Sequence, residues 1–322
     1  MKARRPAQNP RMEFSLAADR PLALPRWLQA RIEAEAARFL FDGVPKPDFS
    51  TPAGEPALTK PDSVSWRVFK NPISLFIGGA SAVLLEFAEP RVRSGVWEHT
   101  SFRDDPVRRL RRTGLAAMMT VYGPKSEAEA MIARVRRIHS RIAGQTPSGE
   151  AYRADDLELL NWVHATAAFG FVEAYNRFVE PLSKADISRF YLEGAPAAHL
   201  YGASAAPRSE EELFAFFDAM RPKLEPSPII FAFLDIMRRA PILPQASRPF
   251  QRLLVRAAAD ILPAWARALL GLNSEWELKE WERRIVRGAA RIVERIPLAG
   301  SPPVEACRRL ALPETYLFMA RA

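Results

Sequence analysis

The sequence has one cysteine, few histidines and no long apolar run. Cys307 stands alone, so no intrachain disulfide forms and a reducing compartment is expected. The best candidate for a membrane span, residues 77–87, is shorter than the roughly 18 apolar residues that a span needs and contains Glu86. Residues 1–11 are basic, and no apolar segment follows them, so no secretory signal is expected. These absences predict a cytoplasmic protein without a transmembrane span.

The net charge of +9 and the pI near 10.0 raise the question of an anionic partner. The basic residues are spread over many segments and alternate with Glu and Asp. This pattern is typical of solvated helix faces rather than of a nucleic-acid surface. No nucleic-acid partner is expected, and a peripheral contact with a membrane surface stays open.

Several motifs that mark metal and nucleotide sites are missing. There is no His-Glu-x-x-His of a zincin, no Cys-x-x-Cys-His of covalent haem, and no Gly-x-Gly-x-x-Gly or phosphate loop. No histidine has a glutamate three residues before it, which excludes the usual di-iron signature. What remains is noncovalent chemistry on the four histidines, which are His99, His139, His164 and His199.

Helix signals dominate the chain. Asn71-Pro72 and Asp105-Pro106 each place a capping residue before a proline at the first helical position. Gly123-Pro124 is typical of a helix end. Period-2 alternation is missing almost everywhere, and the sequence predicts an all-α fold of about nine or ten helices. Boxes of the form Ser-x-x-Glu predict further starts at Ser126/Glu129, Ser209/Glu212 and Ser274/Glu277.

Proline-rich stretches divide the chain into three parts. Residues 1–62 are expected to form an N-terminal helix and an extended segment, since 41–62 is rich in proline. Residues 63–300 are expected to form a single bundle-like domain of many helices. Residues 301–322 are expected to be a loosely structured tail, and Pro263 is expected to kink a helix that runs from about 249 to 270.

Two histidines are placed inward by helical periodicity. His139 shares a face with Val135, and His164 lies in the apolar stripe from Leu160 to Phe178. On geometry alone, each is more often a hydrogen-bonded core residue than a metal ligand. Two inward histidines in a helical bundle still make haem or a mononuclear metal worth testing.

A second group lies on one face of the helix that begins at Pro106. Arg109, Arg112 and Thr113 are related by i, i+3 and i+4. They form either a solvated basic face or the cationic and hydroxyl wall of a polar cavity. The residues alone favour the solvated face.

Ordered motifs add a family resemblance over about residues 65–250. The chain closely resembles the catalytic domain shared by latex-clearing proteins (rubber oxygenases) and MpaB-type oxygenases. The segments that carry this resemblance are Gly78–Pro90, Gly95–Phe102, Asp105–Thr113, Val135–His139, Gly144 and Asp156–Thr166.

The resemblance implies an oxidoreductase that holds haem b and uses O₂ as co-substrate on a small hydrophobic, unsaturated molecule. By position, His139 matches the histidine that holds the iron. Arg109, Arg112 and Thr113 match the distal face, and Glu89 is the candidate for the family's acidic base, with Glu86 and Glu98 as competitors.

One alternative remains for the iron ligand, and one remains for the function. His164 is the second candidate for the iron ligand, with His139 behind it. His99 is expected to support the site, and His199 has no expected role. Arg112 stands where the rubber enzyme has lysine, and Glu89-Pro90 stands where bacterial relatives often have His-Pro. These departures motivate a second hypothesis, a helical protein that binds a lipid or isoprenoid in the same cavity without turnover.

Overall fold

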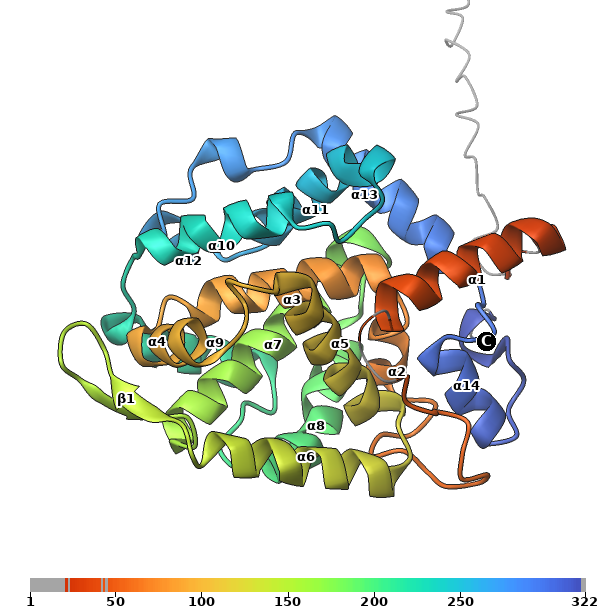
Figure 1. Ribbon diagram of the computed structural model, residues 1–322, viewed down its shortest axis with the longest axis horizontal. Helices are drawn as coiled ribbons and strands as arrows, with labels where there is room; N and C mark the ends of the chain where they lie inside the picture. The colour runs from red at the N-terminus through yellow and green to blue at the C-terminus, as the bar shows by residue number, and fades with distance from the viewer. Residues whose placement is uncertain (1–20, 23, 42, 44–45, 320–322) are drawn as a thin grey trace, which may run out of the picture.

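The computed structural model describes residues 21–22, 24–41, 43 and 46–319. Over these residues it contains fourteen α-helices and one short hairpin, which confirms the predicted helical fold (Figure 1). Nine or ten helices was too low a number, because short helices such as α2 and α12 have too few turns to show periodicity. The α-helices are α1 (Arg26–Phe41), α2 (Val64–Val68), α3 (Pro72–Glu86), α4 (Pro90–His99), α5 (Pro106–Tyr122), α6 (Lys125–His139), α7 (Leu157–Phe178), α8 (Lys184–Tyr201), α9 (Glu210–Met220), α10 (Pro228–Arg239), α11 (Arg248–Asp260), α12 (Ala264–Leu269), α13 (Glu280–Val293) and α14 (Pro302–Arg309).

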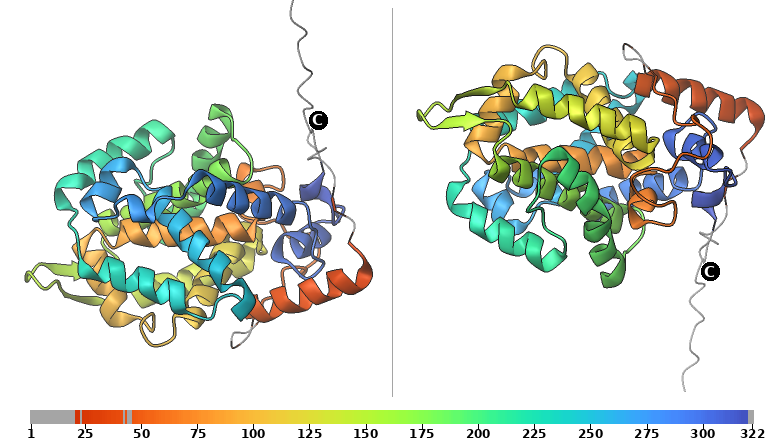
Figure 2. Two further views of the ribbon diagram at one scale, coloured as in Figure 1. Left: turned by 90° about the horizontal axis from the view of Figure 1, so that it is seen from above. Right: turned by 90° about the horizontal axis from the view of Figure 1, so that it is seen from below.

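The remaining regular structure is small. Strands β1 (Ala143–Gln145) and β2 (Ala151–Arg153) pair antiparallel and project from one end of the molecule (Figures 1 and 2). Single turns of 3₁₀ helix lie at Arg221–Lys223, Gln245–Ser247, Ser274–Trp276 and Tyr316–Phe318.

Most of the predicted helix starts are confirmed by their caps. The side-chain oxygen of Asn71 accepts hydrogen bonds from the amides of residues 73 and 74, and Asp105 accepts one from residue 108, each at 3.1 Å. Ser209 caps α9 in the same way. The starts expected at Ser126 and Ser274 were wrong, since α6 begins at Lys125 and Ser274 opens a 3₁₀ turn.

The centre of the fold is the crossing of α3 and α7, which run antiparallel through the middle of the molecule (Figure 2). Their backbones touch. A Cβ atom on Gly170 would lie 2.3 Å from the carbonyl oxygen of Gly78, and one on Gly78 would lie 2.6 Å from that of Gly170. Only glycine allows this approach. Around the crossing lies one continuous core that includes Leu84 and Trp162, both fully buried.

Helices α5 and α6 form a hairpin whose turn is Gly123 and Pro124. The two helices meet at this turn and splay apart toward their other ends, where α7 lies behind them (Figure 1). Helix α6 also packs on α8, which in turn packs on α7. As a result, the C-terminal ends of α3 and α6 and the N-terminal ends of α5 and α7 come together at one end of the molecule.

Two expectations near the C-terminus were wrong. Pro263 does not kink one helix but separates α11 from α12, because it stands at the N-cap of the second. The expected loose tail is a buried helix over residues 302–309, since two prolines open α14 and pack into the core. Arg309 is buried there and donates hydrogen bonds to three backbone carbonyl oxygens, which belong to Phe49, Glu55 and Tyr122.

No single helix among the described residues has the length and apolar composition to cross a membrane. One bent pair, α3 with α4 at 114°, passes the same test by length and composition. The basic segment at residues 1–11, where no secretory signal is expected, lies outside the described residues.

The crossing of α3 and α7 predicts an unusual response to alanine. Gly170→Ala should lower the free energy of unfolding by roughly 1–3 kcal/mol, because the added methyl group meets backbone that cannot move aside. Gly288→Ala in α13 is the matched control, since its Cβ would meet nothing within 4 Å, and it should be neutral or raise the stability by up to about 1 kcal/mol. Urea unfolding measures both, and equal effects would contradict the backbone contact.

Candidate functional site

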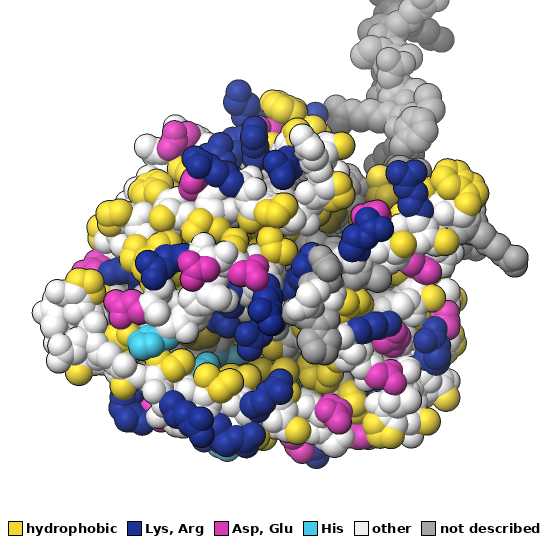
Figure 3. Space-filling view, in the orientation of Figure 1, with side chains coloured by type: hydrophobic (Ala, Val, Ile, Leu, Met, Phe, Trp, Pro, Cys, Tyr) yellow, Lys and Arg dark blue, Asp and Glu magenta, His cyan; other side chains and the backbone are white. Residues whose placement is uncertain are grey.

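A hollow opens on the face of the molecule between α5 and α6. Figure 3 shows histidine surface at its floor, apolar side chains around it, and Lys and Arg side chains on both sides. Arg109, Thr113 and Thr120 share the face of α5 that looks toward this space. The hydroxyl groups of Thr120 and Tyr201 lie 3.0 Å apart and join α5 to the end of α8.

His139 is the last residue of α6 and lines an open pocket of about 510 Å³ between α6, α7 and the end of α8. Its ring makes no hydrogen bond with the described part of the chain. Burial lowers its pKa, as does the nearby charge of Arg109, while Asp155 acts in the opposite direction. His139 is therefore neutral at pH 7 and keeps a free lone pair, which is the form that binds a metal.

His164 lies on α7, one turn beyond Leu160, which lines the same pocket. Burial lowers its pKa to about 4. Its Nε2 atom faces α8, where a Cβ on Gly194 would stand 4.0 Å away. Like His139, it makes no hydrogen bond within the described residues. A hydrogen-bonded core histidine, the reading that geometry alone favoured, does not describe either residue.

Glu86 is the last residue of α3, and burial raises the pKa of its carboxyl group to about 7, opposed by the charge of Arg109. The pKa of Arg109 is lowered by burial and by Arg112, and raised by Glu86. Within the described residues, neither side chain makes a hydrogen bond or an ion pair. Neither is among the side chains whose polar atoms are fully buried without a partner. Both groups are therefore part-buried without a partner among the described residues.

The three residues of the predicted distal face lie on α5. Arg109 is half-buried, close enough to Glu86 and Arg112 for their charges to act on it, while Arg112 and Thr113 are exposed. The Thr113 hydroxyl donates to the carbonyl oxygen of Arg109 at 3.0 Å and keeps its own oxygen free to accept. The structure thus brings Glu86, Arg109, Thr113 and the two histidines to the same end of the fold.

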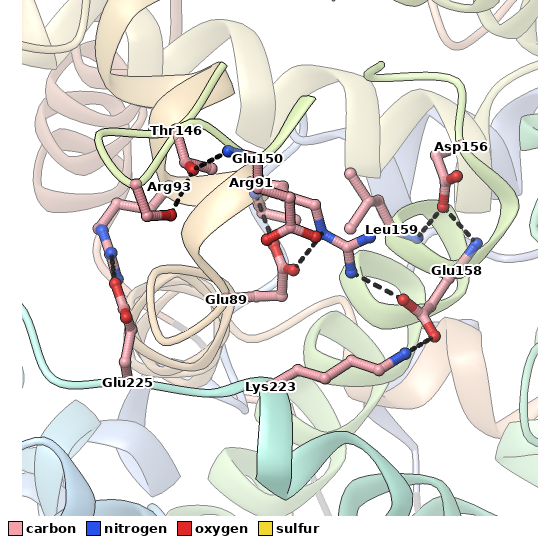
Figure 4. A network of polar contacts seen from close by, with 12 residues as sticks. Glu89, Arg91, Arg93, Thr146, Glu150, Asp156, Glu158, Leu159, Lys223 and Glu225 are labelled. Atoms are coloured by element: carbon pink, nitrogen blue, oxygen red, sulfur yellow. Dashed lines mark hydrogen bonds and ion pairs between the residues drawn. The ribbon is translucent and has the colours of Figure 1, made fainter. Parts of the chain in front are cut away.

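Glu89 is placed elsewhere, as the N-cap of α4. Its side chain accepts from the amide of Val92 at 2.8 Å and pairs with Arg91, which also binds Glu158 (Figure 4). Lys223 binds the other oxygen of Glu158 and extends the network. Glu89 is 1% exposed, with both oxygens engaged, so it acts as a structural residue. Of the candidate bases, Glu86 is the one beside Arg109.

The remaining candidates lie at the edge of the site. The Nε2 atom of His99 is 3.1 Å from the hydroxyl of Tyr152, which also donates to Glu98 at 3.4 Å. Gly144 leaves room for that hydroxyl, since a Cβ there would lie 2.6 Å from it. His99 and Glu98 thus fasten the β-hairpin to α4, and His199 is exposed on α8.

The described residues contain no group of three or more His, Cys, Asp or Glu side chains arranged to hold a metal ion. A metal bound by side chains alone therefore finds no ligand set in this part of the chain. An iron that brings its own porphyrin needs only one or two ligands from the protein. His139 on the wall of the pocket, with His164 one turn beyond the pocket residue Leu160, meets that lesser demand.

The two glutamates predict opposite effects on stability. The folded-state pKa of Glu86 lies above its ordinary value of 4.5, so the wild type loses stability as the pH rises from 4.5 to about 7. In ligand-free protein, Glu86→Gln should therefore raise the free energy of unfolding by up to about 3 kcal/mol at pH 8 and by little at pH 5. Glu89→Gln should lower it by about 3 kcal/mol, because it breaks a buried ion pair. Urea unfolding at the two pH values measures both changes, and a loss of stability in Glu86→Gln at pH 8 would contradict the placement of Glu86.

The chain matches a known protein family. Residues 66–295 match the family described as ER-bound oxygenase mpaB/B'/Rubber oxygenase, catalytic domain. Among curated proteins no match was found, and none was found among solved structures. The matched range includes every residue placed above around the hollow. Since it also spans most of the chain, the protein belongs to the family of mpaB/B' and rubber oxygenase catalytic domains.

Proposed function

We propose that this protein is a haem b-dependent oxygenase that acts on a hydrophobic, unsaturated substrate. Membership of an oxygenase family supports the class of reaction. The observation that carries the proposal is a set of buried or part-buried polar groups at one end of the fold, which have no hydrogen-bond partner among the described residues: Glu86, Arg109, His139 and His164. Buried polar groups without partners destabilise a fold, so their presence together indicates a ligand that completes them.

The residues fit haem. His139 would hold the iron, since it is neutral at pH 7 and lines a pocket large enough for a cofactor. Arg153 holds the carboxylate of Asp155 with bonds of 3.0 and 3.1 Å, and that carboxylate keeps a negative charge near the imidazole. Such a charge increases the electron donation of a ligating histidine. Bound haem would supply the activation of O₂.

The chain's own residues would position substrate and move protons. The desolvated guanidinium of Arg109 and the hydroxyl of Thr113 can donate hydrogen bonds to oxygen atoms that develop negative charge, where a dry site strengthens them. Glu86 can give or accept a proton at neutral pH, because its pKa is about 7. A guanidinium group offers hydrogen-bond donors and no lone pair for iron, so the role of Arg112 would be electrostatic rather than that of a ligand.

The second candidate function, binding of a lipid or isoprenoid without turnover, is favoured by two features. Glu89 is committed to the α4 cap, and Arg112 cannot take the place of a coordinating lysine. Oxygen uptake by haem-loaded protein with an added unsaturated lipid separates the two functions. Uptake above the rate without lipid supports the oxygenase, and its absence favours the binding protein.

The iron ligand is tested by single replacements in protein expressed with adequate haem supply. His139→Ala should lose most of the bound haem, because it removes the metal–nitrogen bond, while His164→Ala should keep it. His199→Ala is the control, since His199 is exposed on α8. Haem content is measured by absorption and by iron analysis. Release of haem by His164→Ala alone would reverse the assignment, and a colourless wild type would refute haem binding.

A further inference from the structure

Exposed arginines flank the hollow on both sides. Arg108 and Arg112 stand on α5, Arg134 and Arg137 on α6, and Arg141 directly follows α6. None of these side chains makes a hydrogen bond or an ion pair with the described part of the chain. On other helices, exposed arginines pair with acidic residues one turn away, as Arg177 does with Glu173 and Arg239 with Asp235. Arg112, Arg134, Arg137 and Arg141 have no acidic residue three or four positions away in the sequence.

The hairpin brings these arginines to the same level. Arg109 and Ile138 stand equally far from the turn at Gly123 and Pro124, one on each helix. Arg108 and Arg112 therefore lie at about the same level along the hairpin as Arg134 and Arg141. The electrostatic influence of Arg109 on the pKa of His139 agrees with this placement. Figure 3 shows Lys and Arg side chains on both sides of the hollow and along its lower edge.

Apolar side chains lie beside these arginines, which form the cationic rim. Ile138 is 48% exposed on α6, between Arg134 and Arg141 on the same helix face. Val163 on α7 is 36% exposed and comes level with Glu86, because α3 and α7 run antiparallel from the contact at Gly78 and Gly170. The pocket that His139 lines is also bordered by two leucines, Leu157 and Leu160. An apolar molecule would bury these side chains.

We propose that the molecule entering the hollow is an amphiphile with an anionic head group, a carboxylate or a phosphate, on an apolar tail. Guanidinium groups without carboxylate partners repel one another, and an anion at the rim relieves that repulsion through charge-assisted hydrogen bonds. The apolar floor receives the tail. The inference rests on the proposed function in one respect, that the tail reaches the reactive end of the same hollow.

A single bound molecule fits these observations better than a membrane surface. Leu157 and Leu160 border a pocket of about 510 Å³, which can receive one tail, whereas a membrane-docking face presents its apolar groups outward, beyond the charged ones. A neutral hydrocarbon would leave the arginines of the rim without partners. It would also leave Arg109 beside Glu86, whose carboxyl group is half protonated at pH 7.

The test compares oleate with oleyl alcohol, which has the same tail, below their micelle concentrations on the haem-loaded protein. Titration calorimetry should show oleate binding at least about 10-fold more tightly, the difference that one hydrogen bond to a charged group makes. The preference should shrink as salt is raised, because the rim is exposed. The double variant Arg134→Glu/Arg141→Glu should lose the preference. Its matched control, Arg248→Glu/Arg252→Glu, reverses two exposed arginines on α11 that also lack partners among the described residues and should keep it.

Three results would overturn the proposal. These are equal affinity for oleate and oleyl alcohol, an unchanged preference in Arg134→Glu/Arg141→Glu, and binding to vesicles of phosphatidylglycerol but not to monomeric oleate. The absorption spectrum of the same samples reports haem separately. Colourless protein that still prefers oleate would refute the oxygenase and support the amphiphile, whereas haem-loaded protein without the preference would do the reverse.

Discussion

The direct contact between the backbones of α3 and α7 is the constraint on which the rest of the structure depends. At Gly78 and Gly170 the two helices approach more closely than any pair of side chains would permit. Because they run antiparallel, the end of α3 lies beside the beginning of α7, and Glu86 therefore comes level with Val163 and His164. The other helices are arranged around this pair, and the hollow is the space that α5 and α6 leave above it.

The site combines strong packing on one side with unmet polar groups on the other. Each of Glu86, Arg109 and His164 is enclosed without a partner among the described residues, which opposes folding. The burial of apolar side chains in the core around Leu84 and Trp162 offsets this unfavourable free energy. Such a division is typical of proteins whose function requires local strain, because stability is supplied by residues that do not take part in the chemistry.

Local signals in the sequence were sufficient for the fold class and for much of the site. Asn71 and Asp105 mark the starts of their helices in the sequence, because a helix cap depends only on the next few residues. The inward placement of His139 and His164 follows from helical period. The family motifs, rather than composition, indicated an oxygenase family, and the family match bears out that family.

What the sequence could not supply depends on distant neighbours. Glu86 and Glu89 are three residues apart and chemically identical, and only the folded chain shows that one faces Arg109 while the other caps a helix and binds Arg91. The buried helix α14 was missed for a similar reason, since prolines that usually mark loops also suit the first turn of a helix. No sequence motif pointed to Asp155, because its charge acts on the pKa of His139 through space.

The turn of the α5–α6 hairpin is held by segments from both ends of the described chain. Arg309 and Trp66 bind the backbone and the hydroxyl of Tyr122, and Pro56 accepts a hydrogen bond from the amide of Lys125. The angle between the two helices, and with it the width of the hollow, is thus fixed at a point far from the histidines. During synthesis, Arg309 emerges long after His139 and His164. The opening of the site acquires its final shape only once nearly the whole chain has been made, so its geometry is a late product of folding.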